Sequence, residues 1–147
     1  MEVTTMQSEL IPSSALKDNQ TIRTVILPDE SRKQFCLFTE SLYSELDPQT
    51  QTEAVLADRG ILLMWRLRRT GRIEAGLLSE KMEEKHYNGT ITYRTISEAF
   101  ENDCRNRQCF EKLGRYERGL ERSLYTALEK LHELQKGRKK VINVTPG

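Results

Sequence analysis

Cysteine and histidine are the side chains through which this sequence could bind a metal or supply a nucleophile. It contains Cys36, Cys104 and Cys109, together with two histidines, His86 and His132. A structural zinc site needs four such ligands, usually in closely spaced pairs. Here the one pair of cysteines is loosely spaced, and the histidines lie far apart in the chain. We therefore expect no metal site, and three reduced thiols in a cytoplasmic protein.

Charged residues within an apolar pattern are the second set with chemical potential. The helix expected over about residues 50–84 has an apolar sector formed by Val55, Leu62, Ile73 and Leu77, widened by Leu56, Leu63 and Leu67. Arg59 and Arg66 project from the centre of that sector, and Glu117 takes an apolar position in the last predicted helix. An unpaired buried charge is strongly destabilising, so we expect Glu117 to form an ion pair with Arg66 or Arg59. A catalytic carboxylate or a ligand-binding arginine in a cleft is the functional alternative.

An aromatic residue among arginines indicates a nucleic-acid-binding face. The basic residues of this hypothesis lie on one helix face and in a run near the C-terminus: Arg68, Arg69, Arg72, Arg138, Lys139 and Lys140. Guanidinium groups bind phosphates, and Trp65 on the same face could stack on a base. The pattern is equally typical of a tryptophan covered by another helix, with arginine stems along the rim. Because 23 basic residues are balanced by 22 acidic ones, nucleic-acid binding is the alternative hypothesis only.

Enzyme signatures are absent from the sequence. It has no glycine-rich phosphate loop, no His-Glu-x-x-His and no Gly-x-Ser-x-Gly motif. We therefore expect no enzymatic activity, no catalytic residue and no cofactor. The longest apolar run, residues 61–65, is far shorter than the ~20 residues of a membrane span. We therefore expect no membrane partner. No secretory signal opens the chain, which also favours a cytoplasmic protein.

An all-α domain is expected to position these side chains. The 147 residues suit one domain, and a charged fraction of 31% favours helices with solvated outer faces. Helical periodicity predicts a small antiparallel bundle with two long helices and two shorter ones, at about 50–84, 107–135, 31–46 and 95–103. Capping motifs mark three helix starts, Ser31-x-x-Gln34, Thr50-x-x-Glu53 and Thr95-x-x-Glu98, and Asp47-Pro48 marks a helix end.

The remaining segments are expected to be less regular. Residues 21–27 and 90–94 are rich in β-branched side chains and are predicted to be extended, and residues 90–94 could pair with residues 22–26. Residues 1–20 are predicted to be disordered or loose, and residues 137–147 to form a basic tail. The helical domain itself is expected over residues 21–136.

The last predicted helix carries a coiled-coil-like seam, in which leucines or alanine recur over about four heptads from Leu113 to Leu134. Its antiparallel partner within the chain or a second chain could cover this seam, and the sequence leaves both readings open. We interpret the seam, with an exposed-looking edge on the earlier helix, as an interaction surface: Ile61, Trp65, Leu113, Leu120, Leu124, Leu131 and Leu134. The preferred hypothesis is therefore a non-enzymatic protein that binds a protein partner or forms a homodimer.

Three short motifs resemble those of a family of uncharacterised small bacterial helical proteins. They are a Leu-Pro-acid lead-in at 27–29, Trp-Arg-Leu-Arg-Arg at 65–69 and Arg-Tyr-Glu at 115–117. The similarity covers about residues 25–136. Many relatives carry an Asn-Ala-Leu-Lys-His-Gly-Leu-like segment before the lead-in, which residues 16–23 lack. The resemblance implies a helical fold, with Arg66 and Glu117 in matching motifs, and implies no established activity.

Overall fold

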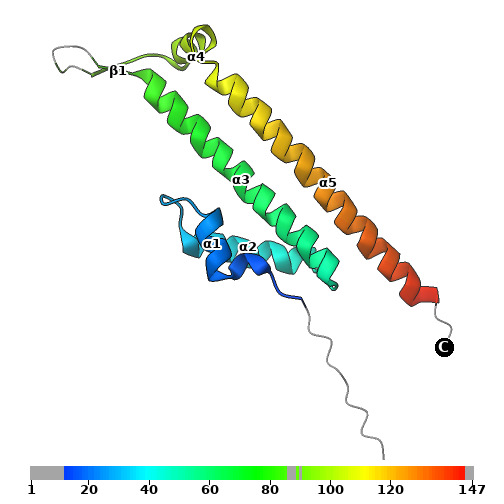
Figure 1. Cartoon of the computed structure of the whole chain (residues 1–147). Coiled ribbons are helices and arrows are strands. Elements are labelled where there is room, and N and C mark those ends of the chain that lie inside the picture. Colours follow the sequence, from blue (N-terminus) through cyan, green and yellow to red (C-terminus); the bar gives the residue numbers. More distant parts are fainter. Residues whose placement is uncertain (1–11, 86–88, 90, 145–147) are drawn as a thin grey trace, which may run out of the picture. The chain divides into compact units, whose positions relative to one another are not determined.

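The chain is all-α, as its sequence predicts, apart from one short two-stranded ribbon. The computed structural model describes residues 12–85, 89 and 91–144 (Figure 1). Its elements are, in order, η1 (Ala15–Lys17), α1 (Asn19–Val25), α2 (Arg32–Leu46), α3 (Gln51–Met82), β1 (Glu83–Lys85), β2 (Ile91–Tyr93), α4 (Ile96–Arg105) and α5 (Cys109–Val144). In this described part of the chain, no helix is long and apolar enough to cross a membrane.

Two compact units make up the chain. The first comprises the residues up to Leu62 together with those from Ala127 onward, and the second comprises Leu63–Thr126. Both long helices contribute to both units, and α3 packs with α5 in each.

Capping side chains define the short helices of the first unit. Asp18 accepts hydrogen bonds from two amides in the first turn of α1, and Ser31 accepts one from the first turn of α2. Helix α2 ends at Asp47, whose φ of 43° is left-handed, directly before Pro48. Proline disfavours helical geometry in the preceding residue, so this end could be predicted from the sequence.

Helix α1 replaces the extended segment predicted for residues 21–27. The β-branched residues there favour a strand, but the Asp18 cap satisfies the first amides of a helix. Ile22, only 4% exposed, then packs into the core from that helix. Capping and burial together override the weaker local preference for extended backbone.

Residues 12–20 are packed rather than loose. Ser14 donates a hydrogen bond of 2.6 Å to the carboxylate of Asp58 on α3, and the amide of Ala15 donates one of 2.9 Å to the same carboxylate. Leu16 is 6% exposed. The prediction of a loose segment is therefore wrong from residue 12 onward, while residues 1–11 lie outside the described residues.

Small residues build the α3 face of the first unit's core. The buried apolar side chains of this unit are Leu16, Ile22, Phe35, Ala54, Ala57, Ile61, Ala127 and Leu131. Ala54 and Ala57 allow neighbouring helices to approach α3 closely. Val55, which the sequence analysis assigned to the core, is instead 60% exposed. The predicted sector followed the large side chains and missed the small ones that pack.

The second unit contains the ribbon and α4. Strands β1 and β2 pair antiparallel, with Glu83 opposite Tyr93. The prediction of an extended segment at 90–94 therefore holds for β2, but its predicted partner is wrong, because residues 22–25 belong to α1. Helix α4 begins at Thr95 with a reciprocal capping box, in which Thr95 and Glu98 each accept the other's amide hydrogen.

The core of the second unit lies between α3, α4 and α5. Its buried residues are Leu63, Trp65, Thr70, Ala99, Asp103, Leu120 and Leu124. Ile73, a member of the predicted apolar sector of α3, is 40% exposed. The predicted sector therefore departs from the packed face in this unit as well.

Helix α5 extends well past its predicted end near residue 135. The segment predicted as a basic tail is helical as far as Val144. Gly137 lies inside this extension, and one glycine within a helix costs only about 1 kcal/mol relative to alanine. Side chains next to it, Gln135 and Arg138, hold this part of α5 in the first unit.

Candidate functional site

The predicted interaction surface is mostly core. Six of its seven members are buried or half-buried: Ile61, Trp65, Leu113, Leu120, Leu124 and Leu131. Leu134, at 43% exposed, is the member that reaches solvent. Heptad periodicity indicates burial but does not say which chain provides the covering helix. The chain's own helices cover most of the seam, so these six residues are not an exposed surface.

Arg66 and Glu117 each have a polar partner, but not each other. The Arg66 guanidinium donates hydrogen bonds of 3.0 and 3.2 Å to the hydroxyl of Tyr116. The Glu117 carboxylate accepts one of 3.2 Å from the hydroxyl of Thr70. Glu117 is exposed, as is Arg59 in the first unit. The predicted ion pair is wrong because it assumed buried charges, whereas solvent reaches these side chains and no burial forces them to pair.

The tryptophan on the arginine-rich face of α3 is buried within the structure. Trp65 is 4% exposed, and the guanidinium carbon of Arg68 lies 5.5 Å from the centre of its ring. The indole therefore makes a cation–π contact with Arg68 and is too buried to stack on a base. Arg69 is half-buried and Arg72 exposed, and each takes part in an interaction within the structure.

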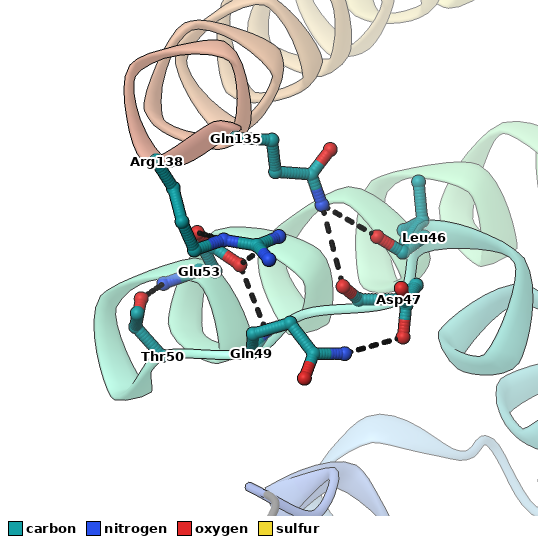
Figure 2. Close-up of polar contacts among 7 residues, drawn as sticks. All are labelled: Leu46, Asp47, Gln49, Thr50, Glu53, Gln135 and Arg138. Atoms are coloured by element: carbon teal, nitrogen blue, oxygen red, sulfur yellow. Dashed lines mark hydrogen bonds and ion pairs between the residues drawn. The ribbon is translucent and has the colours of Figure 1, made fainter. Parts of the chain in front are cut away.

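A cluster of polar side chains joins the end of α5 to the corner between α2 and α3 (Figure 2). We call it the corner cluster; its residues are Leu46, Asp47, Gln49, Thr50, Glu53, Gln135 and Arg138. At its centre is Glu53, 1% exposed, which accepts a hydrogen bond of 2.8 Å from the amide of Gln49. Arg138 approaches the same carboxylate with Nε at 3.2 Å and Nη2 at 3.5 Å. This two-pronged geometry suits a guanidinium and compensates a buried charge.

Gln135 completes the corner cluster by binding the end of α2. Its side-chain amide donates hydrogen bonds of 2.7 Å to the carbonyl of Leu46 and 3.5 Å to that of Asp47 (Figure 2). The last carbonyls of a helix have no partner within it, so a side chain from α5 satisfies one here. The corner cluster therefore has a structural role, and Arg138 is engaged in it. Of the predicted basic run, Lys139 and Lys140 are exposed.

A second buried carboxylate, Asp103, joins α4 to α5 in the second unit. It is 1% exposed and accepts hydrogen bonds from the amides of Phe110 at 2.9 Å and Cys109 at 3.1 Å. The ammonium of Lys81 on α3 lies 2.9 Å away. Burial raises the pKa of Asp103, but the Phe110 amide, Lys81 and the Cys109 amide outweigh it and lower that pKa to about 2. Asp103 thus acts as an ionised cap for the first amides of α5.

An apolar groove lies between α3 and α5 in the first unit. It has a volume of about 480 Å³ and is lined by Thr52, Val55, Leu56, Lys130, Glu133 and Leu134. Two of its apolar side chains are well exposed, Val55 at 60% and Leu134 at 43%, and the third, Leu56, is half-buried. Among the interactions of the described residues, neither Lys130 nor Glu133 forms an ion pair. The groove thus combines accessible apolar surface with two opposite charges that are open to a partner.

Sequence reasoning found only part of these features. Leu134 was predicted for its heptad position, and Glu53 was noted within a capping box. Val55 was wrongly predicted to be buried. The small residues Ala54 and Ala57 were the signal in the sequence that marks the packed face of α3. Nothing in local spacing indicates the role of Asp103, because its partners come from two separate stretches of chain, Lys81 and the adjacent pair Cys109 and Phe110.

The cysteines do not gather with other ligands. Cys36, Cys104 and Cys109 are free thiols. Within residues 12–85, 89 and 91–144, no three His, Cys, Asp or Glu residues lie close enough together to hold a metal ion. His86 falls outside the described residues, and His132 is exposed on α5.

Comparisons with known proteins give no relative from which a role could be inferred. No protein-family model, no curated protein and no solved structure matches this chain. The resemblance carried by the Trp-Arg-Leu-Arg-Arg and Arg-Tyr-Glu motifs therefore stays a prediction.

Proposed function

We propose that this chain is a non-enzymatic helical protein that acts through protein–protein contacts and self-associates through the groove of its first unit. The observation that carries the proposal is the exposure of Val55 and Leu134 on one groove, 60% and 43%. Burying such apolar side chains contributes about 25 cal/mol per Å². A surface of this kind favours association with another protein surface.

Charge supports a second copy of the chain as the partner. A two-fold dimer places the same patch of both copies face to face, so the patch must complement itself. Lys130 and Glu133 carry opposite charges on the rim of the groove. In an antiparallel arrangement, Lys130 of one copy meets Glu133 of the other on both sides of the apolar centre. Two helix pairs joined in this way form a four-helix arrangement, a common solution for amphipathic helices.

Sedimentation equilibrium on the full chain, from low to high micromolar concentration, tests the proposal. The wild type should form dimers. Val55→Glu or Leu134→Glu should each weaken dimerisation at least about tenfold, because a charge would be buried without a partner. Leu37→Glu is the matched control, since Leu37 on α2 is 56% exposed outside the groove and should leave dimerisation unchanged.

Charge reversal gives the sharper test. Lys130→Glu alone and Glu133→Lys alone should each weaken the dimer, because like charges then meet across the two-fold axis. The double reversal restores opposite charges between copies and should recover most of the affinity. A wild type that stays monomeric throughout contradicts self-association. Co-purified nucleic acid that high salt removes would instead favour the nucleic-acid hypothesis.

A further inference from the structure

A second pocket lies in the other unit, at the turn from α4 to α5. It has a volume of about 380 Å³ and is lined by Phe100, Asp103, Cys104, Gln108, Phe110 and Glu111. This is the lower end of the roughly 300–1,000 Å³ range of ligand pockets. It therefore suits one large side chain or a short peptide segment.

Two aromatic rings form the apolar part of this pocket. Phe100 is 52% exposed, and its ring centre lies 5.7 Å from that of the half-buried Phe110. One helical turn earlier on α4, Ile96 is 62% exposed and extends the apolar strip. Aromatic residues that stay exposed in this way are typical anchors of protein–protein contacts.

Contacts made by the lining residues themselves fix the backbone around the pocket. Asp103 accepts the amide hydrogens of Cys109 and Phe110 and pairs with Lys81 at 2.9 Å, which fixes the start of α5 against α4. Gln108, with a φ of 53°, turns the chain between the two helices. A site that is already ordered loses little conformational entropy when it binds.

The acidic side chains of the pocket are paired, whereas two nearby basic side chains are free to bind a partner. Its two carboxylates each have a cation partner at 2.7–2.9 Å: Asp103 with Lys81, and Glu111 with Arg115. Arg107, next to Gln108, and Lys112, whose amide donates to the carbonyl of Gln108, are both exposed. Within the described part of the chain, neither of these two cations forms an ion pair. Arg107 and Lys112 directly neighbour Gln108 and Glu111, which line the pocket, so they supply free positive charge next to it, at what we call its rim.

We propose that this pocket binds a segment of another protein in which an apolar or aromatic anchor is flanked by aspartate or glutamate. The anchor packs on Phe100 and Phe110, and the flanking carboxylates pair with Arg107 and Lys112. Complementary charge at the rim steers the encounter and selects against basic segments. The pocket shares no residue with the groove of the first unit, so either surface can fail its test without affecting the other.

Fluorescence anisotropy with a labelled acidic peptide, Asp-Glu-Phe-Leu-Glu-Asp, tests this inference on the full chain. We expect saturable binding that weakens with salt, and binding at least about tenfold weaker for a counterpart with lysine at each acidic position. Phe100→Glu should weaken binding at least about tenfold, and so should Arg107→Glu combined with Lys112→Glu. Two matched controls on α5, Tyr125→Glu at a residue 60% exposed and Arg122→Glu, should leave it unchanged.

A thiol in the pocket gives a measurement that needs no substitution. Cys104 is exposed and lines the pocket, whereas Cys36 and Cys109 are half-buried. Bound peptide should slow alkylation of Cys104 by iodoacetamide and leave Cys36 unaffected. Absence of binding, equal binding of the lysine peptide, or binding without protection of Cys104 would each overturn the proposal.

Discussion

Replacing Asp103 by asparagine should lower the free energy of unfolding by about 2–3 kcal/mol at neutral pH. The pKa of this carboxyl falls from its ordinary value of 3.8 to about 2 in the folded chain. Each pH unit of difference corresponds to about 1.4 kcal/mol, so ionised Asp103 stabilises the fold by about 2 kcal/mol. The interaction with Lys81, 14% exposed, is part of this shift, and asparagine leaves that ammonium without its carboxylate.

The same pKa shift predicts how the loss depends on pH. Because the folded pKa is lowered, the stabilisation is complete above about pH 5 and is lost as the pH falls towards 2. Asp103→Asn lacks this titration, so the stability gap between wild type and variant should shrink by about 1 kcal/mol between pH 6 and pH 3. Urea unfolding followed by circular dichroism measures both values.

A neighbouring acid on the same helix serves as the control. Glu101 pairs with Arg105 on the surface of α4, where their side chains are 63% and 75% exposed. Glu101→Gln should therefore change stability by less than about 0.5 kcal/mol at either pH. A gap for Asp103→Asn that stays constant from pH 6 to pH 3 would refute the assignment of Asp103 as an ionised cap.

Three further substitutions probe the packing of the chain, each by urea unfolding. Arg138→Met should destabilise it by about 1–3 kcal/mol, because Glu53 is left buried without its cation, and an unchanged stability would contradict that pairing. Thr39→Val should stabilise it by about 1 kcal/mol, since the hydroxyl of Thr39 is buried and lacks a hydrogen-bond partner among the described residues; a loss would mean that the hydroxyl is bonded. Gly71→Ala should stabilise α3 by about 0.5–1 kcal/mol, because no atom of the described residues beyond its chain neighbours and the backbone of its own helix lies within 4 Å of the added carbon; destabilisation would show that this face is covered.

Local signals in the sequence were enough to predict most helices. The capping motifs at Ser31, Thr50 and Thr95 predicted the starts of α2, α3 and α4, because a cap depends on residues three positions apart. The Asp47–Pro48 pair likewise predicted the end of α2. These features need no knowledge of the rest of the chain.

Long-range contacts decided what the sequence could not show. Helix α1 forms because Ile22 reaches a core that only the folded chain provides, and α5 continues past Gly137 where Arg138 meets Glu53. The groove at Val55 was missed for a related reason. Periodicity of large apolar residues locates a stripe on a helix, but the packed face of α3 is formed partly by small alanines, and Val55 lies outside it. Burial of the seam was predictable, whereas the identity of its covering helix was not.

Dimerisation through the first unit's groove is the central claim, and sedimentation equilibrium of the Lys130 and Glu133 reversals tests it most directly. Self-association predicts a wild-type dimer, at least about tenfold weaker association for Lys130→Glu or Glu133→Lys alone, and recovery in the double variant. A wild type that is monomeric at every concentration, or single reversals that dimerise as well as the wild type, would contradict it.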